Sequence, residues 1–154
     1  MKPIFQTIPP PEGKGNCLQA CIASILELPL EAVPHFALWY DSPNWHEKLN
    51  GWLIQTAGVY EITVQANQMY LETIYGYALL NGLSERGIMH SVVIFNGEMV
   101  HDPYPNGKGI ITPESYGVFV SVAPDRLVPP ELRPSYRAYM SMVDPDWDNP
   151  NRYD

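Results

Sequence analysis

Three residues far apart in the sequence carry a thiol, an imidazole and a carboxylate that could act together. Cys17 begins an apolar run, His90 opens a β-type segment, and Asp102 closes the next one. A cysteine at a helix start lies near unpaired backbone N–H groups and the positive end of the helix dipole, which favour a thiolate. Such a thiol becomes a nucleophile when an imidazole takes its proton and a third group orients that imidazole. The order of these residues predicts covalent catalysis by a cysteine.

The thiol must be positioned by the helix that begins with it. The run from Cys17 to Leu28 is apolar on nearly all sides, which predicts a buried helix rather than a surface one. Asn16 is a favourable N-cap residue, and Pro29 is expected to stop the helix. The second cysteine, Cys21, is expected to be a core residue beneath the first.

The histidine and the aspartate lie on a predicted β-hairpin around Asn96-Gly97. If these two residues form the whole turn, His90 lies opposite Pro103 and Asp102 points to the other face. If the loop has three residues and ends at Gly97, His90 pairs directly with Asp102 on one face. We expect the second register, because a working triad requires the two side chains to meet.

Other elements are predicted by periodicity and turn residues. Ser42-Pro43 is expected to open a second helix, with Ser42 as its N-cap, and Gly58 to end it. Apolar and polar residues alternate from Tyr60 to Ala66, which predicts a half-buried strand. The remaining expectations are a short turn over 30–33, a strand over 77–80, a loop over 81–87, one helical turn over 113–116 and a strand over 118–122.

Length and charge limit the classes of function. The 154 residues suffice for one domain, which we expect over 1–123, with a Pro-rich acidic tail over 124–154. A net charge of -8 with only nine Lys and Arg argues against nucleic-acid binding and against a polybasic membrane patch. No run approaches the ~20 apolar residues of a membrane span, and the N-terminus lacks the apolar core of a signal peptide.

The cysteine count favours a reducing compartment. Two cysteines about one turn apart on one helix do not suit the geometry of a disulfide. We therefore expect free thiols and a cytoplasmic location, either in a bacterium or in a host cytoplasm if the protein is phage-encoded. The sequence has no phosphate-binding glycine loop and no dinucleotide fingerprint, so no cofactor is expected.

The chain resembles the papain-like cysteine peptidase superfamily. The resemblance rests on Cys17 at its helix, on His90-Ser91-Val92-Val93-Ile94, and on His101-Asp102-Pro103 with Gly107 after it. The nearest branch is the bacteriocin-processing peptidases that cut after a double-glycine leader. Small uncharacterised bacterial and phage proteins with a Gly-Asn-Cys start and a His-Asp-Pro close are also similar. The resemblance covers about residues 4 to 122 and implies an α+β fold with N-terminal helices packed on a small antiparallel β-sheet.

The resemblance also implies roles for individual residues. Cys17 would be the nucleophile, His90 the general base and acid, and Asp102 the orienting group. The family supplies an oxyanion-hole glutamine before the cysteine, for which Gln6 is the candidate, acting with the backbone N–H of Cys17; Asn16 could substitute. The implied partner is a peptide or protein substrate.

Several alternatives stay open on the sequence alone. The same triad could serve an acyltransferase of transglutaminase type, or the fold could be a catalytically inactive peptide-binding module. Leu18, at a position where the peptidases tend to have glycine, motivates the inactive module. An interaction protein that uses the tail from Pro124 is a further possibility. Zinc binding by the two cysteines with His90 and His101 is disfavoured, because the Cys-to-Cys spacing is not that of zinc knuckles.

Overall fold

Helices precede strands along this chain. The computed structural model describes residues 1–8 and 14–123, so the predicted tail over 124–154 lies outside the described residues. The first of two compact units covers Met1–Val122. Its elements are α1 (Cys17–Leu26), the 3₁₀ helices η1 (Leu30–Ala32) and η2 (Phe36–Trp39), α2 (Trp45–Ala57), β1 (Val59–Gln65), the 3₁₀ helix η3 (Leu71–Thr73), β2 (Tyr77–Ser84), β3 (Met89–Phe95), β4 (Glu98–His101) and β5 (Ile110–Ser121).

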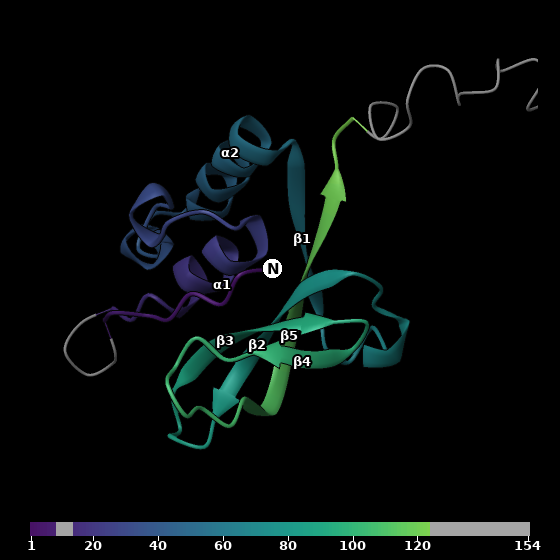
Figure 1. Cartoon of the computed structure of the whole chain (residues 1–154). Coiled ribbons are helices and arrows are strands. Elements are labelled where there is room, and N and C mark those ends of the chain that lie inside the picture. The colour runs from purple at the N-terminus through teal and green to yellow at the C-terminus, as the bar shows by residue number, and fades with distance from the viewer. Residues whose placement is uncertain (9–13, 124–154) are drawn as a thin grey trace, which may run out of the picture. The chain divides into compact units, whose positions relative to one another are not determined.

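The five strands form one antiparallel sheet in the order β1-β5-β2-β3-β4. Figure 1 shows α1 and α2 on one side of this sheet. Alternate residues of β2 and β3 supply two cores: Leu79 and Val93 join the helices, whereas Leu80 and Val92 join a second cluster that includes Ile74. The predicted α+β class with helices packed on a small antiparallel sheet is therefore confirmed.

Helix α1 is buried, as its apolar sequence predicts, but its ends differ from the expectation. It stops at Leu26 because Glu27 adopts a left-handed conformation (φ 56°) and its N–H bonds the carbonyls of Ala23 and Ser24. Pro29 therefore lies beyond the cap. Asn16 occupies the N-cap position, yet its side chain does not cap the helix.

Helix α2 begins two residues later than expected. Ser42 and Pro43 belong to a turn in which the Trp45 N–H donates to the Ser42 carbonyl, and Asn44 takes the N-cap position. The helix ends at Gly58, as predicted, and Gly58 has the left-handed φ of 64° that glycine adopts readily.

Strand β1 exists as predicted, but its buried side is not the apolar one. Tyr60 and Ile62 are 40% and 44% exposed, whereas Glu61 is only 4% exposed. Asn50 of α2 accepts a hydrogen bond from the Glu61 N–H and donates one to the Glu61 carbonyl. These two hydrogen bonds join α2 to the edge strand β1 and hold the Glu61 side chain on the face of the sheet that the helices cover.

The strands β2 and β5 are longer than their sequences suggest. The loop expected from Asn81 is wrong over its first four residues, because β2 continues to Ser84 through two register shifts against β5. Gly82 allows this close pairing, since a Cβ there would lie 2.1 Å from the Thr112 carbonyl oxygen. The helical turn expected over 113–116 is likewise wrong, because β5 is continuous across it.

The hairpin of β3 and β4 has a two-residue turn. Phe95 pairs with Glu98, and both Asn96 (φ 51°) and Gly97 (φ 82°) are left-handed. These values fit the type I′ turn that suits the twist of a hairpin. The three-residue loop that we expected is therefore wrong.

A bulge in β4 compensates for the shorter turn. Val93 pairs with His101, although the register at the turn would pair it with Val100. Because a one-residue shift moves side chains to the opposite face, the extra residue places Asp102 on the side of the hairpin where His90 lies. The triad therefore needs the bulge rather than the longer loop.

The N-terminal segment over 1–8 has no helix or strand and ties the two layers together. Its Ile4 N–H donates to the Ser24 hydroxyl of α1, and the Ile4 carbonyl contacts Nε2 of His101 in β4 at 2.8 Å. In the part of the chain described, no single helix is long and apolar enough to cross a membrane. The segments Cys17–Leu26 and Leu30–Trp39 meet that test only together, with a bend of 100° between them.

Candidate active site

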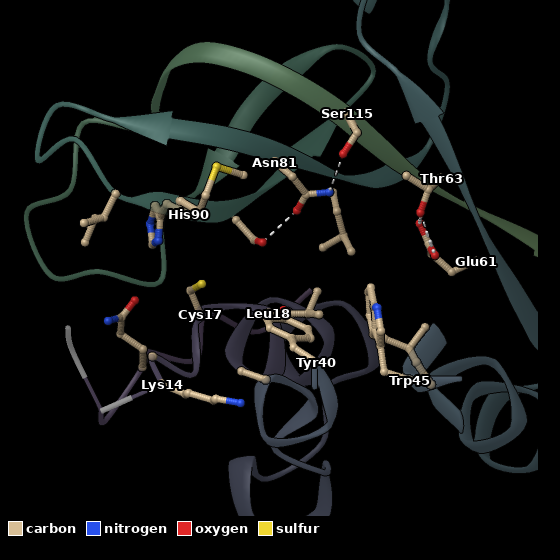
Figure 2. A pocket seen from close by; sticks show the side chains of 18 of the residues that line it. Lys14, Cys17, Leu18, Tyr40, Trp45, Glu61, Thr63, Asn81, His90 and Ser115 are labelled. Atoms are coloured by element: carbon tan, nitrogen blue, oxygen red, sulfur yellow. Dashed lines mark hydrogen bonds between the residues drawn. The ribbon is translucent and has the colours of Figure 1, made fainter. Parts of the chain in front are cut away.

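A cleft of about 590 Å³ lies between the helices and the sheet. Cys17 and His90 line one end of it, and Glu61 and Thr63 line the other, as Figure 2 shows. Leu18, Tyr40 and Trp45 lie between the two ends (Figure 2), and Leu49 and Leu79 also line the cleft. A cleft with mostly apolar walls and a few polar groups is typical of a site for small molecules or peptide side chains.

At the first end, the Cys17 thiol and the His90 ring interact electrostatically. Figure 2 shows the sulfur directed from α1 toward this ring on β3. Burial raises the pKa of the thiol, but the hydrogen bond to His90 and its charge lower it. Backbone N–H groups of Ser91 and Leu18 add to the lowering, so the pKa of Cys17 lies below its usual value. The surroundings of this cysteine favour a thiolate.

Behind the histidine lies the predicted carboxylate. Nε2 of His90 is 2.8 Å from Oδ1 of Asp102, and the two side chains are 3% and 7% exposed. With Nε2 engaged by Asp102, Nδ1 is the ring nitrogen left for the sulfur of Cys17. Burial lowers the pKa of His90, but Cys17 and Asp102 outweigh it, so the pKa is raised overall. The imidazole is therefore held in orientation and favoured in its protonated form.

Asp102 is itself fixed by the loop after it. Oδ1 accepts a hydrogen bond from the Tyr104 N–H at 2.8 Å, and Oδ2 accepts one from the Gly109 N–H at 2.9 Å. Burial raises the pKa of Asp102, but His90 and these two N–H groups lower it below its usual range. Gly107 packs against the carboxylate so closely that a Cβ there would lie 2.2 Å from Oδ2. The glycine after Asp102 is thus required by the position of the carboxylate.

Gln6 was the first candidate for an oxyanion-hole donor. Its side chain is buried and lines the same cleft as Cys17. The Gln6 N–H donates to the Pro103 carbonyl, which fixes this residue beside the Asp102 loop. Its Oε1 is buried and has no hydrogen-bond partner among the described residues, and its Nε2 is 3.5 Å from the Ile8 carbonyl oxygen. The amide of Gln6 is therefore only weakly engaged by the protein.

Asn16, the other oxyanion candidate, is fully occupied. Its Oδ1 accepts hydrogen bonds from the N–H groups of Thr7 and Ile8, and its Nδ2 donates to the Thr7 hydroxyl and to Oε1 of Gln19. Asn16 thus anchors the segment that carries Gln6 to the start of α1. This geometry favours Gln6 over Asn16 as the side-chain donor.

Cys21 and His101, the other two residues considered as zinc ligands, each have a different hydrogen-bond partner. Cys21 is fully buried and donates its thiol to the Ser91 carbonyl at 3.3 Å, and burial raises the pKa of this thiol well above its usual value. His101 contacts the Ile4 carbonyl. Within residues 1–8 and 14–123, no three His, Cys, Asp or Glu side chains are grouped to hold a metal ion.

Several cleft residues were not identified from the sequence as part of a site. On the sheet wall, the Ser91 hydroxyl donates to Oδ1 of Asn81, whose Nδ2 lies 3.4 Å from the Ser115 hydroxyl. Asn81 fell in a predicted loop, and Ser115 in a predicted helical turn. No sequence signal placed them in one cleft, because strand pairing brings them together.

Comparisons with models of known protein families, with curated proteins and with solved structures gave no match to this chain.

Proposed function

We propose that this protein is a papain-like thiol hydrolase that cleaves a peptide or isopeptide bond through Cys17, His90 and Asp102. The observation that carries the proposal is the thiol–imidazole–carboxylate arrangement, in which Nε2 of His90 is 2.8 Å from Oδ1 of Asp102 and the Cys17 sulfur is directed toward the same ring (Figure 2). The family resemblance implies a thiol-bearing helix packed on an antiparallel sheet, and here His90 lies in β3 of such a sheet and Asp102 directly after β4. The cleft beside the thiol provides room for a substrate chain.

The proposed reaction has two steps. The Cys17 thiolate attacks the substrate carbonyl, and His90 donates the proton that it took from the thiol to the leaving amine. Water, deprotonated by His90, then attacks the thioester and releases the acid. Asp102 keeps the imidazole oriented and stabilises its protonated form throughout.

The developing oxyanion needs donors near the sulfur. The N–H of Cys17 lies in the first turn of α1, where backbone N–H groups have no partner within the helix. The weakly engaged Gln6 amide, turned with Nε2 toward the substrate, supplies the second donor. The direction of the Cys17 sulfur toward His90 (Figure 2) favours this proposal over an inactive binding module, which predicts a thiol directed away from the histidine.

Peptide probes with an electrophilic group test the proposal. The native protein should form one covalent adduct, located at Cys17 by peptide mass analysis. It should also hydrolyse amide substrates that have the same peptide sequence as the probe. Cys17→Ala should abolish both, whereas Cys21→Ala, which removes the buried thiol, should retain both. Equal labelling of the two cysteines, or hydrolysis that survives Cys17→Ala, would contradict the proposal.

A further inference from the structure

The far end of the cleft holds a buried carboxylate that the triad does not use. The Glu61 side chain is only 6% exposed, yet it lines the cleft. Its partners are the Thr63 hydroxyl, 3.0 Å from Oε1 and 3.3 Å from Oε2, and His46, whose Nε2 contacts Oε2. No Lys or Arg in the described part of the chain forms an ion pair with it.

The carboxylate has capacity for a further donor. An ionised carboxylate can accept about four hydrogen bonds, and Oε1 of Glu61 receives one from Thr63. Gly117 on the neighbouring strand gives the carboxylate room to pack against β5, because a Cβ there would lie 2.7 Å from Oε1. A buried anion without a permanent cationic partner is costly, and a cationic ligand would reduce that cost.

The other charges of the cleft are already paired. Lys14 forms an ion pair with Asp41, and His90 is held by Asp102 and Cys17. Among the described residues that line the cleft, Glu61 is therefore the acid whose only ionic partner, His46, is charged only when protonated.

The walls between the two ends suit the stem of a basic side chain. Trp45 and Tyr40 present aromatic rings there and Leu18 presents an aliphatic group, as Figure 2 shows. Methylene groups of Lys or Arg pack on such surfaces while the charged head reaches a polar partner. Aromatic faces add a favourable interaction with the cation itself.

We infer that Glu61 determines specificity, and that the substrate carries an arginine or lysine side chain that reaches Glu61 while the bond to be cleaved lies at Cys17. This inference rests on the proposed function and names the substrate class of the same cleft. The basic side chain lies along the cleft with its charge on Glu61, and the scissile carbonyl lies at Cys17. Thr63 and His46 hold the carboxylate in place.

Two substrates of the same shape but different charge test whether Glu61 recognises the charge of the side chain. Peptide amides that differ only in arginine or citrulline, its neutral isostere, should differ in kcat/KM by about tenfold or more on the native protein, because a buried charge left unpaired is penalised. Glu61→Gln keeps the size of the side chain but removes its charge, so it should remove most of this preference. Glu98→Gln, which changes an exposed acid outside the cleft, should leave the preference intact. The native comparison needs no variant, so it holds even if Glu61→Gln fails to fold.

Binding to Cys17→Ala distinguishes failure of the subsite from failure of the reaction. Selective binding of the arginine peptide without hydrolysis by the native protein would uphold the subsite and overturn the proposed hydrolase. Hydrolysis at equal rates for arginine and citrulline would overturn the subsite and uphold the hydrolase. Equal losses for both substrates in Glu61→Gln would also overturn it, since a purely structural role predicts that result. Absence of both binding and hydrolysis would overturn both.

Discussion

The two ends of the cleft each have a histidine–carboxylate pair, but only one pair contacts a thiol. The His90 side chain is 3% exposed and lies between Asp102 and Cys17. The His46 side chain is 35% exposed, and beyond Glu61 its other hydrogen-bonding neighbour is the Thr63 hydroxyl. A histidine–carboxylate pair alone therefore does not define a catalytic centre. What distinguishes the first end is the sulfur at a helix start and a carboxylate held by backbone N–H groups.

The largest loss of activity should follow removal of the Cys17 sulfur, which only the first end of the cleft possesses. Cys17→Ser replaces the thiolate with a hydroxyl of much higher pKa, so amide hydrolysis should fall by about 10³-fold or more. The measurement is kcat/KM on a peptide amide, with the fold verified by circular dichroism. Cys21→Ser, one turn along α1, is the matched control, and a comparable loss there would break the distinction between the two thiols.

The second prediction concerns the orienting acid. Asp102→Ala leaves the imidazole of His90 without its partner, so kcat should fall on the order of 10²–10⁴-fold. The fall should appear in kcat rather than KM, since Asp102 acts on the reacting groups and does not line the substrate cleft. An unchanged kcat would show that the carboxylate has only a structural role.

The third prediction concerns the loop that holds this acid. Gly107→Ala introduces a Cβ 2.2 Å from Oδ2 of Asp102, so it should cost about 1–3 kcal/mol of unfolding free energy and reduce kcat. Gly51→Ala in α2 is the matched control, because nothing lies within 4 Å of a Cβ at that position. It should be neutral or stabilising by about 0.5–1 kcal/mol, as expected for Gly→Ala inside a helix. Denaturant unfolding measures both changes, and equal stability of the two variants would contradict the packing argument.

The smallest effect is expected at the other pair. His46→Ala should leave the rate of Cys17 alkylation by iodoacetamide unchanged within about twofold, because the ring lies outside the thiol–imidazole–carboxylate arrangement and surface changes have small effects. The same assay on His90→Ala should show a large decrease. Similar decreases of the alkylation rate in the two variants would contradict the claim that only His90 activates Cys17.

Local sequence signals predicted the parts of the site but not how they are joined. Periodicity and turn chemistry indicate Cys17 at a helix start, His90 on a strand and Asp102 at the end of the next strand. They do not indicate the bulge that brings Asp102 to His90, because the extra residue carries no distinctive side chain and depends on pairing with β3.

The second end of the cleft was missed for a related reason. The alternation in β1 predicts an apolar buried face, yet the helix residue Asn50 fixes Glu61 inward. Asn16 looked like a helix cap and instead anchors the segment before the helix. Both errors come from side chain to backbone contacts between distant segments, which local propensity does not contain.

The pH dependence of Cys17 alkylation tests the activation of this thiol by His90 most directly. In the native protein the rate should rise with an apparent pKa below the usual thiol value, because His90 outweighs the effect of burial. In His90→Ala, burial is no longer opposed by the ring, so the apparent pKa should move upward and the rate near neutral pH should fall. Coincident pH profiles for the two proteins would contradict activation of Cys17 by His90.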